Sequence, residues 1–511
     1  MTRPRVRRPL RRLWAWCAAP PPWVLPAAIG AIALGLRLHG LGDKPLWLDE
    51  VASLRRATAT VSGLIGDSLH GSHYPSYFLL LWLVGQIGTS QFLLRLPSAV
   101  FGAIAASLTC AIGTRVAGRR AGGVAGLLMA FSPFEVQLGQ EARSYTLASC
   151  LILTALLGLV RLARDPAAAT PFWRDRAPRG AWLLYCLGTA GALNVLNVAV
   201  PWLIAANLGA LAIAWRVGRG RRSGFLKNWG LAQLAIILSW LPALACVYFV
   251  SSGDVLYATA WAPAVSAKTL WSTVAPVYLM RISSFITFGL LPAGVPALAA
   301  VSVALVLLGS WRLRREPAML AVLGCAGVLL PAGFLLAAWF VPVLAPRYFA
   351  WSAGPFFILA GAALGRLSLA SFAPLAAGLA AACLVNLMPY YHYETKPRWD
   401  LAAAELAAAA QPGDVVLLDS YYSYVVFSVF AARLGLDDRG VTFTLTPAEA
   451  LEKSPGHTLW AVYGRTGQAA KKSTPQEFRQ QLDALGQPLA ENPIGRYILL
   501  WQIRAPGKPV G

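Results

Sequence analysis

Long apolar runs alternate with short polar stretches over the first 390 residues of the chain. Most of the runs approach the roughly 20 residues that an α-helix needs to cross the hydrocarbon core of a bilayer. They therefore predict an α-helical polytopic membrane protein with about eleven transmembrane helices. The runs fall approximately at residues 23–38, 97–115, 121–138, 144–163, 181–196, 199–215, 229–250, 284–310, 318–341, 349–366 and 370–389.

The apolar run at residues 76–88 decides on which side of the membrane each loop lies. It offers only about a dozen apolar positions, too few for a crossing. If it lies along the membrane surface, four arginine-rich loops all fall on the side of the N-terminus, as the bias of Lys and Arg toward cytoplasmic loops requires. We therefore predict an interfacial helix here, with the N-terminus inside and the C-terminus outside. The four loops lie around residues 115–120, 161–179, 216–222 and 312–315.

The composition becomes more polar after Pro389, and short helical and strand-like patterns follow one another. This change predicts a small C-terminal α/β domain on the periplasmic side. Its expected elements are helices at 398–410 and 475–485 and strands at 415–419, 458–463 and 497–503.

The chain then divides into three parts. Residues 1–22 form a basic cytoplasmic arm attracted to anionic lipid, and the run at 23–38 is an uncleaved anchor rather than a signal peptide. The transmembrane domain spans 23–390, with its first periplasmic loop at 39–96, and the periplasmic α/β domain spans 391–511.

Composition agrees with a membrane protein and excludes two other classes. Hydrophobic residues make up 57% of the chain and charged residues 13%, against about 25% charged residues in soluble domains. The net charge of +22 is concentrated in loops between apolar runs, so we expect membrane lipids and no nucleic acid as partners. The seven cysteines are scattered without a CxxC pair, which supports neither a disulfide framework nor a zinc knuckle.

The stretch Pro45–Leu46–Trp47–Leu48–Asp49–Glu50 carries the first candidate chemistry. It places two adjacent carboxylates among apolar residues, in a chain with only 22 acidic residues out of 511. A carboxylate beside a low-dielectric surface has a perturbable pKa and can act as a general base. The alternative is that Asp49 caps a helix that starts near Val51, with Glu50 in its first turn.

The predicted topology gathers further polar residues on the same face. Singly, each has an ordinary explanation: a loop histidine, a lipid-phosphate anchor, a local ion pair or a snorkelling arginine. Together, a carboxylate base and separated arginines suit the transfer of a group from a phosphate-activated lipid, since arginines can hold the departing phosphate. These candidates are His73, Tyr74, Arg95, Gln140, Glu141, Arg143, Tyr145, Arg347 and Tyr348.

Four motifs in order carry a family resemblance: PLWLDE, HYPSYFLLLW, FLLRLPSAVFGAIAA and FSPFEVQLGQEARSYTL. The chain resembles the membrane glycosyltransferases of the GT-C superfold, and is similar to the bacterial branch related to protein mannosyltransferases and the lipid A aminoarabinose transferase. The resemblance covers residues 23 to about 215 and, in VLAPRYFAW, residues 343–351. It implies that Asp49 is the catalytic base with Glu50 beside it. It also implies that Gln140–Arg143 belong to the site, and that Arg347 and Tyr348 meet the lipid phosphate.

The sequence departs from the family pattern at two places. The usual His-Pro-Pro is His-Tyr-Pro at 73–75, and a frequent Thr-His-Tyr is Leu-Asn-Val at 193–195 or 196–198. The second departure removes a possible metal or sugar contact. We therefore assign no metal ligand, and a divalent metal stays open.

The resemblance implies a glycosyltransferase in the bacterial inner membrane. It would move a sugar, with inversion, from a polyprenyl-phosphate donor to a lipid, glycan or protein acceptor on the periplasmic face. One alternative is a lipid or glycan transporter or flippase, although such proteins often contain internal repeats and no second copy of the Asp-Glu block occurs. Another is a non-catalytic scaffold that presents the C-terminal domain.

Overall fold

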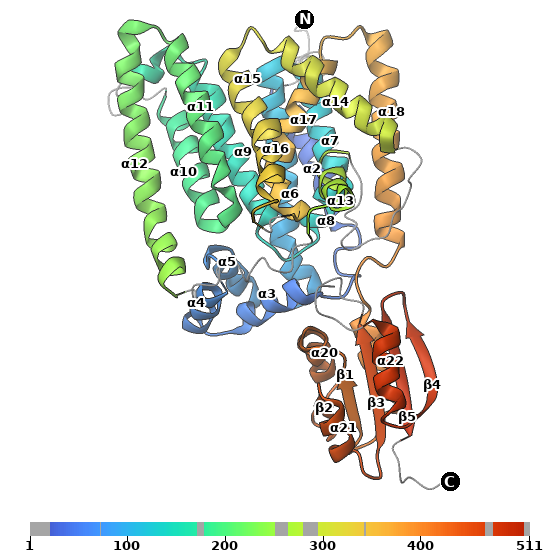
Figure 1. Cartoon of the computed structure of the whole chain (residues 1–511). Coiled ribbons are helices and arrows are strands. Elements are labelled where there is room, and N and C mark those ends of the chain that lie inside the picture. The colour runs from blue at the N-terminus through green and yellow to red at the C-terminus, as the bar shows by residue number, and fades with distance from the viewer. Residues whose placement is uncertain are drawn as a thin grey trace, which may run out of the picture.

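The computed structural model describes residues 21–71, 73–170, 178–250, 264–279, 295–341, 344–464 and 474–504. The predicted basic arm lies almost wholly outside the described residues, as does the first part of the predicted crossing at 284–310. A helical bundle forms one part of the molecule and a five-stranded sheet with its helices the other (Figure 1).

Each of the eleven predicted apolar runs contains a helix. Within the described residues, six helices are long and apolar enough to cross a membrane, or seven if α7 and α8 form one bent span. The protein is thus a multi-pass membrane protein, and the number of crossings stays a prediction. The bundle helices are α2 (Val24–Leu38), α6 (Gln91–Ala117), α7 (Arg119–Phe131), α8 (Pro133–Gly139), α9 (Tyr145–Leu162), α10 (Arg179–Val195), α11 (Pro201–Arg216), α12 (Arg219–Val250), α13 (Ala267–Tyr278), α14 (Val295–Arg312), α15 (Pro317–Gly324), α16 (Leu330–Ala337), α17 (Ala350–Leu364) and α18 (Leu369–His392).

The bend of 60° between α7 and α8 has a local cause. Pro133 lacks an N–H and ends α7, which leaves carbonyl groups without helical partners. The fully buried Arg37 guanidinium of α2 donates to two of them, the carbonyl oxygens of Met129 and Ala130, at 3.3 Å each. The bend directs α8 toward the end of the bundle that carries the candidate site.

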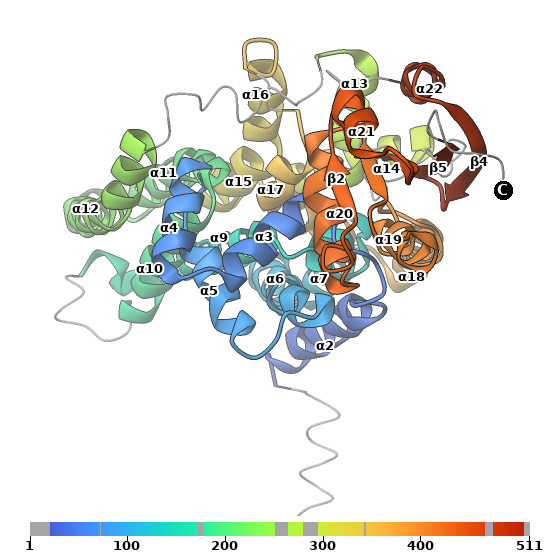
Figure 2. The same cartoon turned by 90° about the horizontal axis from the view of Figure 1, so that it is seen from below.

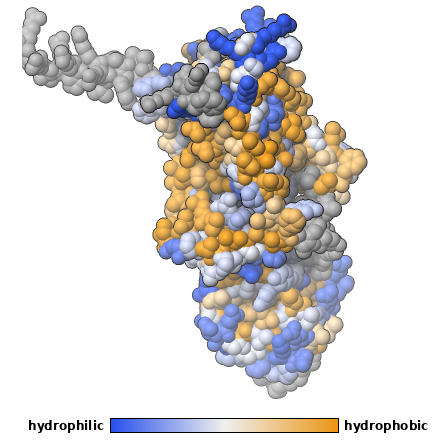
Figure 3. Space-filling model, turned by 90° about the vertical axis from the view of Figure 1, so that its left-hand side faces the viewer, coloured by the Kyte–Doolittle hydropathy of each residue, from blue (hydrophilic) through white to orange (hydrophobic). Residues whose placement is uncertain are grey.

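Basic loops and candidate site lie at opposite ends of the bundle. The loops that follow α6, α9, α11 and α14 meet at one end, where Arg216 pairs with Glu316 at 2.5 Å. Figure 3 shows hydrophilic residues at that end, a broad apolar band below it, and a mixed surface over the α/β part. This separation agrees with the prediction that the arginine-rich loops and the candidate site lie on opposite sides of the membrane.

Three short helices lie across the other end of the bundle: α3 (Leu48–Thr58), α4 (Val61–His70) and α5 (Ser76–Gly85). The predicted interfacial helix corresponds to α5, which has only 10 residues. Trp82 of α5 donates to the carbonyl oxygen of Ala59 at 3.1 Å and so joins α5 to the C-terminal end of α3.

The C-terminal part has a mixed sheet in the order β2-β1-β3-β5-β4, with β1 parallel to β2 and β3, and β5 antiparallel to β3 and β4. The helices predicted at 398–410 and 475–485 and the strands predicted at 415–419, 458–463 and 497–503 are confirmed as α19, α22, β1, β3 and β5. The elements are α19 (Trp399–Ala409), β1 (Val415–Leu418), α20 (Tyr421–Arg433), β2 (Thr442–Thr444), α21 (Pro447–Lys453), β3 (Thr458–Gly464), α22 (Pro475–Asp483), β4 (Gln487–Ile494) and β5 (Ile498–Arg504).

The α/β part is joined to the first loop by a common hydrophobic cluster. Leu46 and Val51 of the loop belong to the same buried cluster as Trp399 of α19 and Phe427 of α20. Figure 2, seen from below, shows α20 beside α3. Burial of this shared apolar surface stabilises one arrangement of the sheet relative to the first loop.

Candidate functional site

The helix α3 fixes the two carboxylates of the first loop. It begins at Leu48 after the extended Trp47, so Asp49 lies inside the first turn and is not the N-cap that the alternative interpretation expected. Carboxylates there interact favourably with the free N–H groups of the helix start. Ser53 donates to the carbonyl oxygens of Asp49 at 3.1 Å and Ala142 at 2.8 Å, which ties the turn to the loop before α9.

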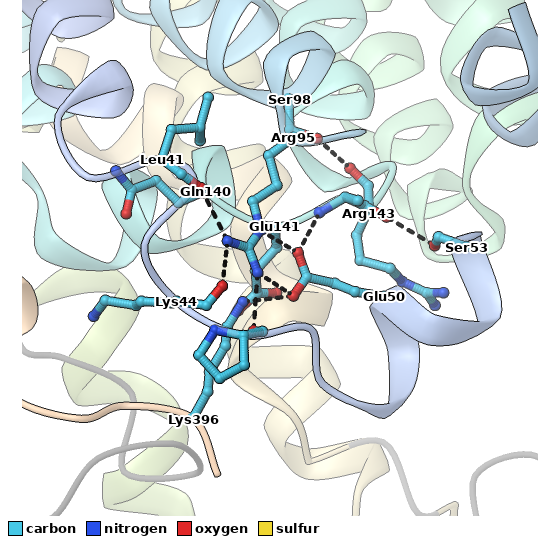
Figure 4. A network of polar contacts seen from close by, with 12 residues as sticks. Leu41, Lys44, Glu50, Ser53, Arg95, Ser98, Gln140, Glu141, Arg143 and Lys396 are labelled. Carbon is cyan, nitrogen blue, oxygen red and sulfur yellow. Dashed lines mark hydrogen bonds and ion pairs between the residues drawn. The ribbon is translucent and has the colours of Figure 1, made fainter. Parts of the chain in front are cut away.

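Glu50 is fully buried and accepts four hydrogen bonds (Figure 4). Its Oε1 accepts from Arg95 Nε at 2.7 Å and from the Ala142 N–H at 3.0 Å, and its Oε2 accepts from Arg95 Nη2 at 2.9 Å and Lys396 Nζ at 2.7 Å. Burial raises the pKa of Glu50, but the charges of Arg95 and Lys396 outweigh burial and lower that pKa to about 2. Glu50 is therefore a fixed negative charge.

Arg95, at the start of α6, uses all five of its N–H donors inside the protein. Besides the two bonds to Glu50, it donates to the carbonyl oxygens of Leu41 at 2.9 Å, Lys44 at 2.8 Å and Pro45 at 3.0 Å. A guanidinium has five N–H donors, so Arg95 has none left for a ligand. It fixes the segment that leads into α3.

Asp49 lies between two other arginines. Its Oδ2 is 3.2 Å from Arg347 Nη1 and 3.9 Å from Arg143 Nε, and among the described residues this oxygen receives no hydrogen bond. Burial raises the pKa of Asp49, but Arg347 and then Arg143 outweigh it, so the pKa lies below its ordinary value. At neutral pH the site thus holds a carboxylate that can accept a proton and two cations that converge on it.

His73 is neutral and contacts the guanidinium of Arg143. Burial, then the charges of Arg143 and Arg56, lower the pKa of His73 to about 3. Its Nε2 lies 3.4 Å from Arg143 Nη2. Because a guanidinium only donates, Nε2 accepts and the imidazole proton lies on Nδ1.

Some of the remaining predicted residues lie beside Asp49 and its arginines. Others hold the surrounding backbone in place, and we call these residues the frame of the site. Tyr145 and Tyr348 lie within electrostatic range of Arg347, whose guanidinium is 5.9 Å from the Tyr348 ring. Gln140 donates to the carbonyl oxygens at the end of α2 and belongs to the frame. The Tyr74 hydroxyl accepts a hydrogen bond from Trp240 of α12 at 2.9 Å.

Glu141 is 2% exposed and accepts from Gln137 at 3.4 Å. Burial raises its pKa, partly offset by Lys396. It lies beside the Glu50 cluster and adds a second carboxyl group to it (Figure 4).

Comparison with solved structures shows the same architecture. ArnT from Cupriavidus metallidurans, bound to undecaprenyl phosphate, superposes with a TM-score of 0.55 at 14% identity, over 95% of this chain and 99% of that one. The oligosaccharyltransferase AglB from Archaeoglobus fulgidus, in complex with an inhibitory peptide and a dolichol-phosphate, gives 0.51 at 12% identity, over 93% and 73%. The chain has the GT-C fold. No family model matches its sequence, and no curated protein does.

This GT-C protein contains site residues that the sequence reasoning missed. Lys396 reaches Glu50 from the segment after α18, and Trp47 lies under Arg347, whose guanidinium is 5.6 Å from the ring. Trp47 stands in the PLWLDE motif itself and could have been included. The only signal for Lys396 was its place among charged residues directly after the last apolar run.

The site does not contain a recognisable metal-binding cluster among the described residues. In the parts of the chain given above as described, no three His, Cys, Asp or Glu side chains come close enough to hold a metal ion. The partners of Asp49 are guanidinium groups, which suit a phosphate as a ligand.

Proposed function

We propose that this chain is a membrane glycosyltransferase that moves a sugar from a polyprenyl-phosphate donor to a hydroxyl group of a lipid, glycan or protein. One observation carries the proposal: Arg143 and Arg347 converge on Asp49 at one end of a GT-C bundle. Two guanidinium groups face one carboxylate there, and guanidinium groups are well suited to hold the phosphate of an anionic donor.

The reaction is a single displacement. Asp49 takes the proton of the acceptor hydroxyl, whose oxygen attacks the anomeric carbon from the side opposite the phosphate. The bond between that carbon and the phosphate oxygen breaks, and the lipid phosphate leaves with the electron pair and is held by Arg143 and Arg347. The configuration at the anomeric carbon is inverted.

The arginines also couple donor binding to the strength of the base. In the empty site they lower the pKa of Asp49, which makes it a weak base. A donor phosphate draws the guanidinium groups toward itself, the pKa of Asp49 rises, and the carboxylate becomes a better proton acceptor only once the donor is in place.

The other predicted residues support this arrangement. His73 holds Arg143 as a hydrogen-bond acceptor, and Trp47, Tyr145 and Tyr348 surround Arg347. Glu50 is a positioning residue, because its four hydrogen bonds leave it no contact with a substrate, and Arg95 has the same part. We therefore expect Glu50 to orient neighbouring groups such as Arg143 without reacting itself, and Arg95 to make no contact with the substrate.

Two further features support the donor and the side of the membrane. Two of the similar structures hold a polyprenyl phosphate, undecaprenyl phosphate in one and dolichol-phosphate in the other. The arginine-rich loops lie at the end opposite the site, which supports, by the positive-inside rule, our proposal that the site faces the periplasm.

The test is transfer of radiolabelled sugar from a panel of hexosyl and pentosyl polyprenyl-phosphate donors by purified protein in liposomes. Asp49→Asn should lower the rate by about 10²-fold or more. Asp43→Asn, an exposed acid of the same loop, should not. Equal rates for wild type and Asp49→Asn would exclude Asp49 as the base. Movement of lipid across the liposome membrane without transfer from any donor would favour a transporter.

A further inference from the structure

The segment between α18 and α19 contains a buried lysine. Thr395 and Lys396 are 1% and 2% exposed, although the segment lies at the junction with the α/β part. Burying an ammonium group costs several kcal/mol unless it is paired, and an ion pair often repays this no better than apolar residues do. Stability alone therefore gives little reason for a lysine to be buried at this place.

Lys396 is the second cation that contacts Glu50, after Arg95. Its Nζ donates to Glu50 Oε2 at 2.7 Å, opposite the two bonds from Arg95. Burial and the charge of Arg95 lower the pKa of Lys396, against Glu50 and Glu141, which raise it. The two carboxyl groups thus favour the charged form of the lysine where burial opposes it.

Glu50 in turn connects the two segments that form the Asp49 site. It is adjacent to Asp49 in the first turn of α3, and its Oε1 accepts from the N–H of Ala142. Ala142 immediately precedes Arg143, whose guanidinium faces Asp49. Any movement of the Glu50 carboxylate would therefore shift Asp49 and Arg143 relative to each other.

A second lysine crosses the same junction in the other direction. Lys44 of the first loop donates to the carbonyl oxygen of Tyr390 and to the Thr395 hydroxyl, the latter at 2.8 Å. The Lys44 contacts attach the segment to the first loop, whereas Lys396 donates a hydrogen bond to the Glu50 carboxylate. The two lysines are thus matched in kind and place but differ in the group they reach.

We propose that Lys396 is a positioning residue of the active site, and that the α/β part takes part in aligning Asp49 with Arg143 through Glu50. The inference rests on the function proposed above. The competing explanation is that Lys396 merely attaches the α/β part to the bundle. Attachment alone predicts that loss of Lys396 and loss of Lys44 act alike, whereas positioning predicts that they differ.

The kinetic test uses four variants of the full chain in liposomes. Lys396→Met should lower kcat by about 10- to 100-fold with a smaller change in the KM for the donor, since small misalignment of reacting groups has effects of this size. Lys396→Arg should restore most of the rate, because it keeps the charge. Lys44→Met and Arg398→Met should stay within about threefold of wild type; the Arg398 guanidinium is held by Asp400.

A readout without catalysis separates this inference from the proposed function. In hydrogen exchange followed by mass spectrometry, Lys396→Met should increase exchange in peptides that cover residues 49–54 and 140–144. Lys44→Met should increase it only around 390–396. If wild type transfers no sugar, the proposed function fails, and the exchange pattern still decides whether Lys396 orders the site. Equal effects of the two lysine variants on kcat and exchange, or no restoration by Lys396→Arg, would overturn the proposal.

Discussion

Replacing Arg347 by Gln removes the cation nearest to Asp49 and should move the pH dependence of transfer. At 3.2 Å and an effective dielectric constant of about 20, a pair of unit charges interacts by roughly 5 kcal/mol. This is an upper bound, because 18% of the Asp49 side chain is exposed. An arginine neighbour commonly lowers a carboxyl pKa by about one to three units. We expect Arg347→Gln to raise the pKa of Asp49 by that amount.

The direction of the shift in pH dependence follows from the protonation state in which Asp49 is active. Asp49 must be ionised to accept a proton, so a higher pKa moves the acid limb of kcat/KM to higher pH, by about one to three units. The assay is sugar transfer across the pH range, with Arg314→Gln, an exposed arginine at the far end of the bundle, as control. An unmoved acid limb, whatever the loss of rate at neutral pH, would refute either Asp49 as the base or Arg347 as its main counter-charge.

Two further predictions concern Glu50 and His73. Arg95 and Lys396 lower the pKa of Glu50 from 4.5 to about 2 despite burial. The wild type therefore has the full stabilisation above about pH 4.5 and loses roughly 3 kcal/mol as the pH falls toward 2. Glu50→Gln should show a shallower loss of thermal stability in detergent over this range, and an equal slope would contradict the assignment. His73→Asn keeps an acceptor for Arg143 and should leave the pH profile of transfer between about pH 5 and 7 unchanged, since a pKa of about 3 does not titrate there. If the transfer rate of wild type changed with pH between about pH 5 and 7 and that of His73→Asn did not, the result would count against a neutral His73.

The elements that the sequence reveals are those with a single strong pattern. The apolar runs of the bundle and the buried strand β1 are uniform enough to be read directly. The helix α20 was missed because YYSYVVFSVF is rich in aromatic and β-branched residues, which favour strands. Strand β4 was missed because Pro488 and Pro493 argue against a strand, and it is tolerated as the edge of the sheet.

The sequence brings four of the candidate residues to one end of the bundle, but it does not reveal which side chains pair with one another. The topology brought Asp49, His73, Arg143 and Arg347 to one end of the bundle, and the structure brings their side chains together. The pairing of Glu50 with Lys396 spans 346 positions, and no local pattern relates the two. Such a contact depends on how the α/β part packs on α3, which is decided by the shared apolar cluster.

The difference between Arg95 and the other arginines shows why residue type alone does not assign a role. Arg95 meets five acceptors, two on Glu50 and three carbonyl oxygens, and its charge and donors are consumed. Arg143 and Arg347 instead converge on one carboxylate oxygen, that of Asp49. An arginine whose five donors all meet protein acceptors builds the frame, whereas the guanidinium groups that face the Asp49 carboxylate suit the phosphate of a donor. The same residue type therefore frames the site at the start of α6 and serves the proposed reaction beside Asp49.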